Sequence, residues 1–269
     1  MKWWDSIRTR FNAKIKDVEP VSEVQRLVYL AYGHLLMEEY DQARSVLLEA
    51  VQFRSAVEDP ETVAFLLTSL ESTWIFREQF EDGIAFFSDY ISRYSRDFAA
   101  YRGRGGVLWY SGRLHEAIED YSRSLELKPV DIMTLSGRGQ VFAELGNHAK
   151  AMEDLDLALE SLRATPKPDP GWARWYEQIE AFVHNGRGFA LGGLGEIERA
   201  MDEFQLSIEM SPENAWVYHN RGRVNDSAGN LERAIEDYEK ALEKRKPPLN
   251  PLRKEHVRLR LAQLGLHAK

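Results

Sequence analysis

The sequence predicts an all-α chain built from repeated helical hairpins. Between residues 98 and 131, apolar or small side chains recur three and four positions apart, which is the spacing of one face of a helix. The turn residues Ser111, Gly112 and Arg113 separate two such stretches. The unit also recurs, because Ala117 has a counterpart 34 residues later at Ala151. A repeated helix–turn–helix unit is therefore the predicted building block.

Six copies of this unit are recognised by their small and large residues. A small residue is followed four positions later by a large apolar one at Ala43/Leu47, Gly83/Phe87, Ala117/Tyr121, Ala151/Leu155, Ala200/Phe204 and Ala234/Tyr238. The last four copies also carry a first-helix glycine (Gly105, Gly139, Gly188, Gly222) and a turn glycine (Gly112, Gly146, Gly195, Gly229). The predicted repeats are 24–57, 64–97, 98–131, 132–165, 181–214 and 215–248.

A 34-residue hairpin with these residues resembles the tetratricopeptide repeat (TPR) family. The resemblance covers residues 24–248 and is strongest in the last four repeats, since the first two lack both glycines. It implies a right-handed superhelical solenoid of about fourteen helices. It also implies a non-enzymatic scaffold or adaptor that binds a protein or peptide partner in its concave groove, although a fold does not identify that partner.

The N-terminal segment, residues 1–23, is predicted to be an amphipathic helix that caps the first repeat. Trp3, Ile7, Phe11 and Ile15 fall on one helical face, with basic residues elsewhere. A bare terminal repeat needs such a cover. A basic amphipathic helix can instead lie on an anionic membrane surface. The alternative function is accordingly a membrane-peripheral assembly factor anchored by this helix.

Two further segments interrupt or end the array. Near residues 163–180, Pro166, Pro168 and Pro170 predict an extended loop. Helical spacing resumes at Trp172 and runs into the repeat at 181, so its first helix should be about two turns longer than the equivalent helices. Residues 249–269 predict a last helix after Pro251, which solvates the end of the array, and a basic tail.

Helix starts are predicted where capping side chains precede the periodic stretches. Asp97 and Asp131 are expected to be N-caps of the third and fourth repeats. Asp59 with Pro60, and Ser211 with Pro212, place a capping side chain before a proline at the first helical position.

The charge distribution argues against a nucleic-acid partner. Residues 1–16 carry a net charge of +4 and residues 244–269 a net charge of +7. The whole chain carries −8, so residues 17–243 must carry −19. An acidic body lacks the broad basic face that nucleic acids require. The chain has no cysteine and no apolar run of about 18 residues, so we expect a cytoplasmic protein with at most weak membrane-surface contact.

No residue pattern predicts catalysis, a metal or a cofactor. The glycines around Gly105 and Gly188 lie inside predicted helices rather than after a strand, so they indicate packing and not a phosphate loop. His184 and His219 occupy similar places in adjacent repeats, but the histidines form no HExxH pair and no cluster with carboxylates at ligand spacing.

Comparison of the repeats predicts a ladder of ion pairs. The seventh residue is Leu30, Leu70, Arg104, Arg138, Arg187 and Arg221, and the twenty-third is Val46, Phe86, Asp120, Asp154, Glu203 and Asp237. An arginine always occurs with an acid, and a leucine with an apolar residue. Both positions face the seam between helices, so we expect them to touch, either within a repeat or between neighbouring repeats.

The candidate partner site is the inner wall formed by the first helices of the repeats. The resemblance places there a mixture of polar, aromatic and basic side chains: Arg102, Trp109, Gln140, Asn185, Phe189, Trp216, His219 and Arg223. One TPR subclass clamps a peptide carboxylate with Lys, Asn and Arg, but the matching positions hold Val28, Tyr32, Ser69, Ala99 and Gly103 in the first three repeats and Ser136, Gln140, Gly186, Trp216 and Asn220 in the last three. The alternative site is the insertion, with Trp172 and Trp175.

Overall fold

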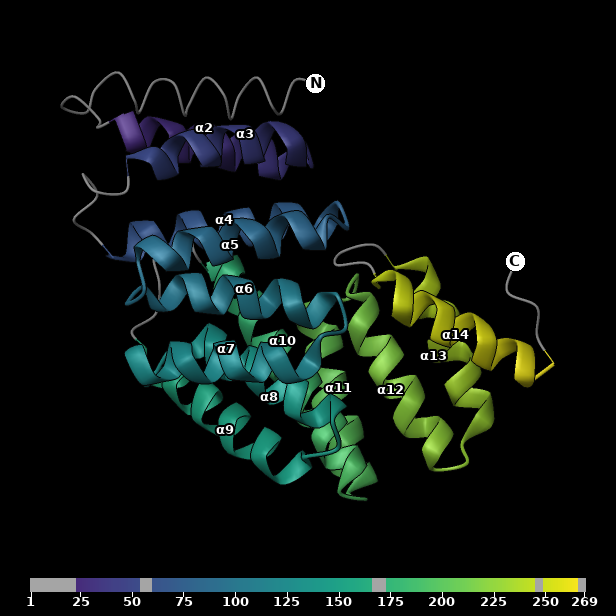
Figure 1. Ribbon diagram of the computed structural model, residues 1–269. Helices are drawn as coiled ribbons and strands as arrows, with labels where there is room; N and C mark the ends of the chain where they lie inside the picture. The colour runs from purple at the N-terminus through teal and green to yellow at the C-terminus, as the bar shows by residue number, and fades with distance from the viewer. Residues whose placement is uncertain (1–22, 54–59, 166–172, 245–248, 266–269) are drawn as a thin grey trace. The chain divides into compact units, whose positions relative to one another are not determined.

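The computed structural model describes residues 23–53, 60–165, 173–244 and 249–265 (Figure 1). Those residues contain thirteen helices and no strand: α2 (Glu23–Leu36), α3 (Tyr40–Gln52), α4 (Pro60–Phe76), α5 (Phe80–Arg93), α6 (Phe98–Tyr110), α7 (Leu114–Leu127), α8 (Ile132–Glu144), α9 (His148–Ala164), α10 (Ala173–Gly193), α11 (Ile197–Met210), α12 (Ala215–Ser227), α13 (Leu231–Glu243) and α14 (Pro251–Gln263). The all-α prediction is confirmed. The predicted N-terminal helix lies outside the described residues.

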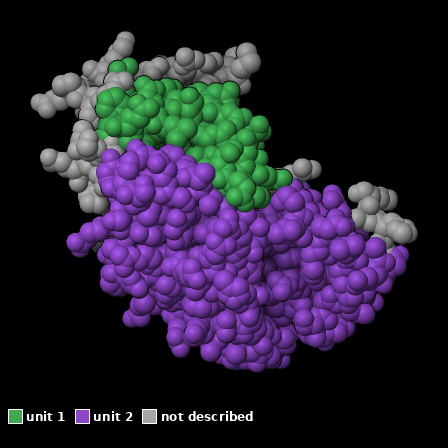
Figure 2. All heavy atoms as spheres, in the orientation of Figure 1, with its two compact units in different colours: residues 1–83 green, residues 84–269 purple. Residues whose placement is uncertain are grey.

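The chain forms two compact units, Met1–Gly83 and Ile84–Lys269, which Figure 2 shows in different colours. In unit 1, α2 and α3 form a hairpin closed by the buried side chains of Leu27, Ala31, Ala43 and Leu47. The ring of Tyr40 stacks on Phe76 at 4.8 Å, which joins this hairpin to α4. Unit 1 therefore has its own apolar core.

Unit 2 consists of two layers of helices. The first helices of its hairpins, α6, α8, α10 and α12, contact one another in sequence and form an inner layer. The second helices, α7, α9, α11 and α13, pack against their own first helix and against the next hairpin. One apolar core cluster runs through the unit from Leu108 to Leu261. This stacking of hairpins is the predicted solenoid arrangement, whereas the right-handed superhelix stays a prediction.

Glycines allow the two helices of a hairpin to approach closely. A Cβ atom at Gly105 would lie 3.0 Å from the Tyr121 ring, and one at Gly222 would lie 2.9 Å from the Tyr238 ring. Contacts this short are tighter than nine in ten real Cβ contacts, so a side chain at either glycine would make the tyrosine ring or the helix shift. The first-helix glycines are thus packing residues, as predicted.

Two of the predicted caps are confirmed and one is wrong, while Asp59 lies outside the described residues, although α4 does begin at Pro60. Asp97 accepts a hydrogen bond from Ala99 N, and Asp131 accepts one from Thr134 N. The prediction for Ser211 and Pro212 is wrong, because α12 begins three residues later and is capped by Asn214, which accepts from Trp216 N. Ser211 instead ends α11. Four residues, 211–214, separate these helices. An Asn at the N-cap satisfies a first-turn N–H as well as a serine does.

The first helix of the repeat at 181–214 is longer than its counterparts. Helix α10 has 21 residues and α12 has 13, a difference of about two turns. The prediction of an extended first helix is therefore confirmed. Pro166, Pro168, Pro170 and Trp172 lie outside the described residues.

Candidate functional site

The predicted ladder of ion pairs is present in all four hairpins that have an arginine and an acid at these positions. Arg104 reaches Asp120 with Nε and Nη2, both at 2.7 Å, and Arg138 reaches Asp154 at 2.7 and 2.8 Å. Arg187 Nε lies 3.0 Å from Glu203, and Arg221 Nη2 lies 2.7 Å from Asp237. The fork of a guanidinium matches a carboxylate geometrically, which accounts for these paired bonds. The predicted seam contact is confirmed.

Each of the first three ladder arginines also reaches the preceding hairpin. Arg104 Nη1 donates to Ser88 and Arg138 Nη1 to Ser122, both at 3.1 Å, while Arg187 pairs with Asp156. The acceptors occupy the same position of successive second helices. The ladder therefore joins neighbouring hairpins as well as the two helices within each hairpin.

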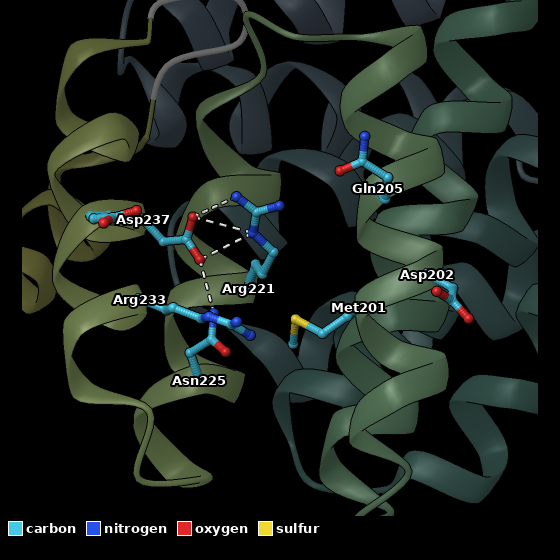
Figure 3. A pocket seen from close by; sticks show the side chains of 8 residues that line it. Met201, Asp202, Gln205, Arg221, Asn225, Arg233 and Asp237 are labelled. Atoms are coloured by element: carbon cyan, nitrogen blue, oxygen red, sulfur yellow. Dashed lines mark hydrogen bonds and ion pairs between the residues drawn. The ribbon is translucent and has the colours of Figure 1, made fainter.

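A hollow of about 420 Å³ lies beside the fourth rung (Figure 3). It is lined by Met201, Asp202 and Gln205 from α11, Arg221 and Asn225 from α12, and Arg233, Glu236 and Asp237 from α13. Gln205 stands where Ser88, Ser122 and Asp156 stand in the other hairpins. Figure 3 shows Arg221 turned to Asp237, with Gln205 across the hollow. The acidic and basic residues that line the hollow nearly balance, so the hollow carries no strong charge.

The predicted inner-wall residues come from α6, α8, α10 and α12, and seven of the eight are buried. Arg102 pairs with Asp131 at 3.0 Å, Gln140 donates to the Phe182 carbonyl at 2.8 Å, and Asn185 accepts from Asn220 at 3.2 Å. Arg223, the half-buried one, lies over the Phe189 ring at 4.4 Å. These contacts hold the inner layer together. Their role in partner binding stays a prediction.

The pKa of Asp131 shows how such a contact works. Burial alone would raise it, but the charge of Arg102, a hydrogen bond from Thr134 and the charge of Lys128 together lower the pKa below its usual value. Asp131 thus stays ionised while buried, and Arg102 is its structural counter-ion.

An aromatic cluster closes the centre of the inner wall. Trp109 of α6 meets Trp216 of α12 edge to face at 5.1 Å, although two hairpins separate them in sequence. Phe182 of α10 lies 6.0 Å from Trp109. The Trp109 indole N–H donates to Glu144 Oε1 at 2.9 Å. The cluster therefore has aromatic faces and one carboxylate at its edge.

Helix α14 inserts an arginine into this cluster. The Arg253 guanidinium lies 3.9 Å from the Trp216 ring centroid and 5.8 Å from that of Trp109, and it pairs with Glu144. Its side chain is 11% exposed. We call Trp109, Glu144 and Trp216 the arginine cage. A cation over aromatic faces and beside a carboxylate is stabilised by both.

Three more contacts hold α14 on the inner layer. Asn250 caps α14 and also donates from Nδ2 to the Tyr110 carbonyl at the end of α6, at 2.9 Å. Arg260 forms a bidentate pair with Asp226 of α12 at 2.7 and 2.8 Å. Val257 and Leu261 are buried, and α14 packs against α13 (Figure 1). The last helix therefore covers the inner wall in addition to ending the array.

The fourth contact is a histidine pair. His219 Nε2 and His256 Nδ1 lie 3.3 Å apart, and the Nδ1 atom of His219 is buried without a hydrogen-bond partner. Burial, and then the charges of Arg253 and Arg223, hold the pKa of His219 well below its usual value of 6.5. His219 is therefore neutral in this arrangement. His184 instead bonds Glu203 at 2.6 Å.

Sequence reasoning missed Glu144, Asp226 and the inward residues of α14. Glu144 and Arg253 are 109 positions apart, and no local pattern indicates such a contact. The basic charge of residues 244–269 against an acidic body was the one available signal. The alternative site is not described: Trp172 lies outside the described residues, as does the side chain of Trp175.

Two general findings apply to the part of the chain that the structure describes. None of its helices is long and apolar enough to cross a membrane. It contains no group of three or more His, Cys, Asp or Glu side chains arranged to hold a metal ion.

Curated relatives match parts of this chain. The small glutamine-rich tetratricopeptide repeat-containing protein 2 of Mycosarcoma maydis is 28% identical over 98 residues, 36% of this chain and 24% of that protein. The Hsp70-Hsp90 organizing protein 3 of Arabidopsis thaliana is 34% identical over 59 residues, 22% of this chain and 11% of that protein. The matched segments thus span less than a quarter of either relative.

The structure is similar to the crystal structure of the APC/C hetero-tetramer Cut9-Hcn1, with a TM-score of 0.64 and 15% identity. That match covers 91% of this chain and 44% of the other, and at this identity it shows the fold alone. Tetratricopeptide repeat models match residues 76–132 and 217–243. Together with the stacked hairpins, their turn glycines and their close-packed helices, these matches show that the chain belongs to the tetratricopeptide repeat family.

Proposed function

We propose that this chain is a non-enzymatic scaffold that binds a protein or peptide partner on the inner wall of unit 2. One observation carries the proposal: the inner wall holds α14, a helix outside the repeats, through the arginine cage and the Asp226 pair. A surface that recognises one helix by aromatic, ionic and apolar contacts is equipped to recognise others.

The relatives support a role in protein assembly but not one particular partner. Some carry the name Hsp70-Hsp90 organizing protein, and they match only a small part of that protein's length. In this chain the positions that clamp a peptide carboxylate in one TPR subclass hold residues such as Val28, Ser69 and Gly103. Without a cation there, we propose a partner other than a free C-terminal carboxylate.

Affinity capture with matched variants tests the proposal. Arg253→Ala should loosen α14 and raise partner recovery, because it removes the side chain that fills the cage. Adding Glu144→Lys to it should abolish recovery, since a lysine there repels a basic partner group and cannot accept the Trp109 hydrogen bond. Circular dichroism should show unchanged helix content in both variants.

The insertion provides the competing outcome. Trp172→Ala and Trp175→Ala should leave partner recovery unchanged. Loss of recovery in this pair, with no response to the variants at Arg253 and Glu144, would place the partner on the insertion. The membrane-peripheral alternative depends on residues 1–22, which lie outside the described residues, and no described contact supports it.

A further inference from the structure

The inward face of α14 has a simple pattern. Its arginines Arg253 and Arg260 stand seven residues apart, and Val257 and Leu261 are the buried apolar residues of the same helix. Seven residues are two helical turns, so both arginines fall on one face about 10 Å apart. Arg258, on the same helix, is exposed. The face is therefore defined by two arginines seven residues apart and by apolar residues four and eight positions after the first arginine.

The wall presents one matching feature for each arginine. The arginine cage receives Arg253 on the Trp216 ring and beside Glu144. Asp226, 15% exposed, receives Arg260 through two parallel bonds of 2.7 and 2.8 Å. A bidentate bond and a cation over an indole both favour arginine over lysine. These features set a spacing and a residue type, and so they define a ligand.

We propose that the wall formed by α6, α8 and α12 is a receptor for a partner's amphipathic helix that carries two arginines seven residues apart. The partner has apolar residues four and eight positions after the first arginine. Helix α14 is the ligand that the chain itself supplies, and it must leave before the partner binds. This inference rests on the proposed function and specifies the partner and the control of the same wall.

The charge of the chain supports a basic ligand. Residues 17–243 carry −19, whereas residues 244–269 carry +7. A basic helix is therefore attracted to this body even before it contacts the wall. An acidic or neutral helix of equal apolar area would lack both the attraction and the two ionic contacts.

Tethering makes α14 a strong competitor. Helix α13 ends at Glu243 and α14 begins at Pro251, so α14 is held near the wall by a short connection. A short tether gives an effective concentration on the order of millimolar. A free helix of the same affinity reaches the wall only when the contacts of α14 are weakened. The full chain should consequently appear closed to a free peptide.

A synthetic peptide of residues 249–265 with a fluorescent label is the probe, and the full chain is the protein. We expect the Arg253→Ala/Arg260→Ala chain to bind this peptide at least about tenfold more tightly than the wild-type chain, measured by anisotropy. The matched control is Arg258→Ala, which removes one exposed arginine from the same helix and should bind as weakly as wild type. A peptide that carries alanine in place of both Arg253 and Arg260 should not bind any chain.

Hydrogen exchange locates the bound peptide. On the Arg253→Ala/Arg260→Ala chain the peptide should protect the ends of α8 and α12, where Glu144 and Asp226 lie. Helix content and thermal unfolding of the variant confirm that its repeats remain folded. Should the double variant misfold, Arg253→Lys provides a milder opening, because lysine keeps the charge but loses the planar stacking.

Three outcomes overturn the inference. One is a folded double variant that binds no peptide, and another is peptide binding that does not depend on the two arginines. The third is a wild-type chain that pairs with a second copy by exchanging α14, seen by light scattering and cross-linking.

The two proposals fail separately. A captured partner that depends on Glu144, without peptide binding, keeps the proposed function and rejects this helix pattern. Peptide binding without any captured partner that depends on the wall keeps this helix pattern and rejects the proposed function.

Discussion

The turns of unit 1 and unit 2 have the same backbone shape but different residues. In unit 2, Gly112, Gly146, Gly195 and Gly229 have φ between +79° and +89°. In unit 1 the equivalent positions are Glu38, with φ of 59°, and Glu78, with φ of 56°. A left-handed backbone costs a residue with a Cβ about 1–2 kcal/mol more than it costs glycine. Hairpin packing therefore imposes the turn, and glycine only makes it less costly.

The seams between the helices differ in the same way. Unit 2 places Arg104 against Asp120, with side chains 23% and 8% exposed. The first hairpin of unit 1 has Leu30 and Val46 at these positions. In unit 1 the ion pair between Arg77 and Asp41 lies on the surface, with each side chain 50% exposed. At these positions unit 1 thus has apolar residues, of which Leu30 is 51% exposed, and unit 2 has partly buried ion pairs.

The ladder should show the largest effect. Replacing Arg104 by leucine leaves the Asp120 carboxylate buried without its counter-ion. We expect a loss of about 3 kcal/mol in the free energy of unfolding, measured by urea denaturation.

The double variant Arg104→Leu/Asp120→Val copies the seam of the first hairpin and sharpens this test. It should recover most of the loss, because a pair of apolar residues leaves no buried charge. A double variant no more stable than the single one would contradict the view that the two seams are interchangeable.

Acid should distinguish the two units next. The pKa of His219 is depressed while α14 packs against it. When α14 is released, His219 takes up a proton more readily, so protonation favours the released state. The stability of the α14 contact therefore falls as the pH drops below 6.5. The charged and polar groups that face this ring are Arg223 on its own helix, Arg253 and His256 on α14, and Tyr238 on α13. The protection factors of the α14 amides, which correct for the intrinsic pH dependence of hydrogen exchange, should fall between pH 7 and pH 5.5, while those of α3 change little.

His219→Gln provides the control for this pH dependence. A glutamine does not titrate, so the fall in the protection factors of α14 should become smaller over this range. Part of it should remain, because burial also lowers the pKa of His256 on α14. A fall as large as in wild type would show that His219 does not control the release of α14.

The turns should give a smaller effect of opposite sign in the two units. Glu78→Gly removes the cost of a left-handed glutamate and should stabilise the protein by about 1 kcal/mol. Gly146→Ala should destabilise it by a similar amount; a Cβ there meets no atom within 4 Å, so the change acts through the backbone alone. Thermal melting of both variants, beside wild type, measures the comparison.

The exposed pair of unit 1 should have the smallest effect. Arg77→Ala breaks its contact with Asp41 and should change stability by about 0.5 kcal/mol or less, because water screens both charges. An effect as large as that of Arg104→Leu would remove the proposed distinction between surface and seam pairs.

Local patterns predicted the repeats, and comparison of repeats predicted the ladder. Some repeats have an arginine and an acid, such as Arg104 and Asp120, where others have a leucine and an apolar residue. The two positions are always 16 residues apart, and in a helical hairpin this separation brings them into contact. The turn glycines were equally readable, but Glu38 and Glu78 gave no sign of their left-handed backbone.

The contacts of α14 could not be predicted because they depend on accumulated geometry. Trp109 meets Trp216 only after three hairpins have each added a small rotation. The cap at Asn214 was missed for a different reason, since Ser211 with Pro212 is an equally good local signal. The predicted inner-wall residues were correctly placed on first helices, but their burial beneath neighbouring side chains has no local signature.

The bond from Asn250 to the Tyr110 carbonyl joins positions 140 residues apart. In an open row of repeats each hairpin touches only its neighbours, so unfolding can begin at an end and proceed one hairpin at a time. Here the end of the row is fastened to an early hairpin, and forming that contact requires closing a long loop of chain. Unit 2 should therefore fold slowly in its last step and melt as a single cooperative body, and detaching α14 should restore gradual fraying from the C-terminal end.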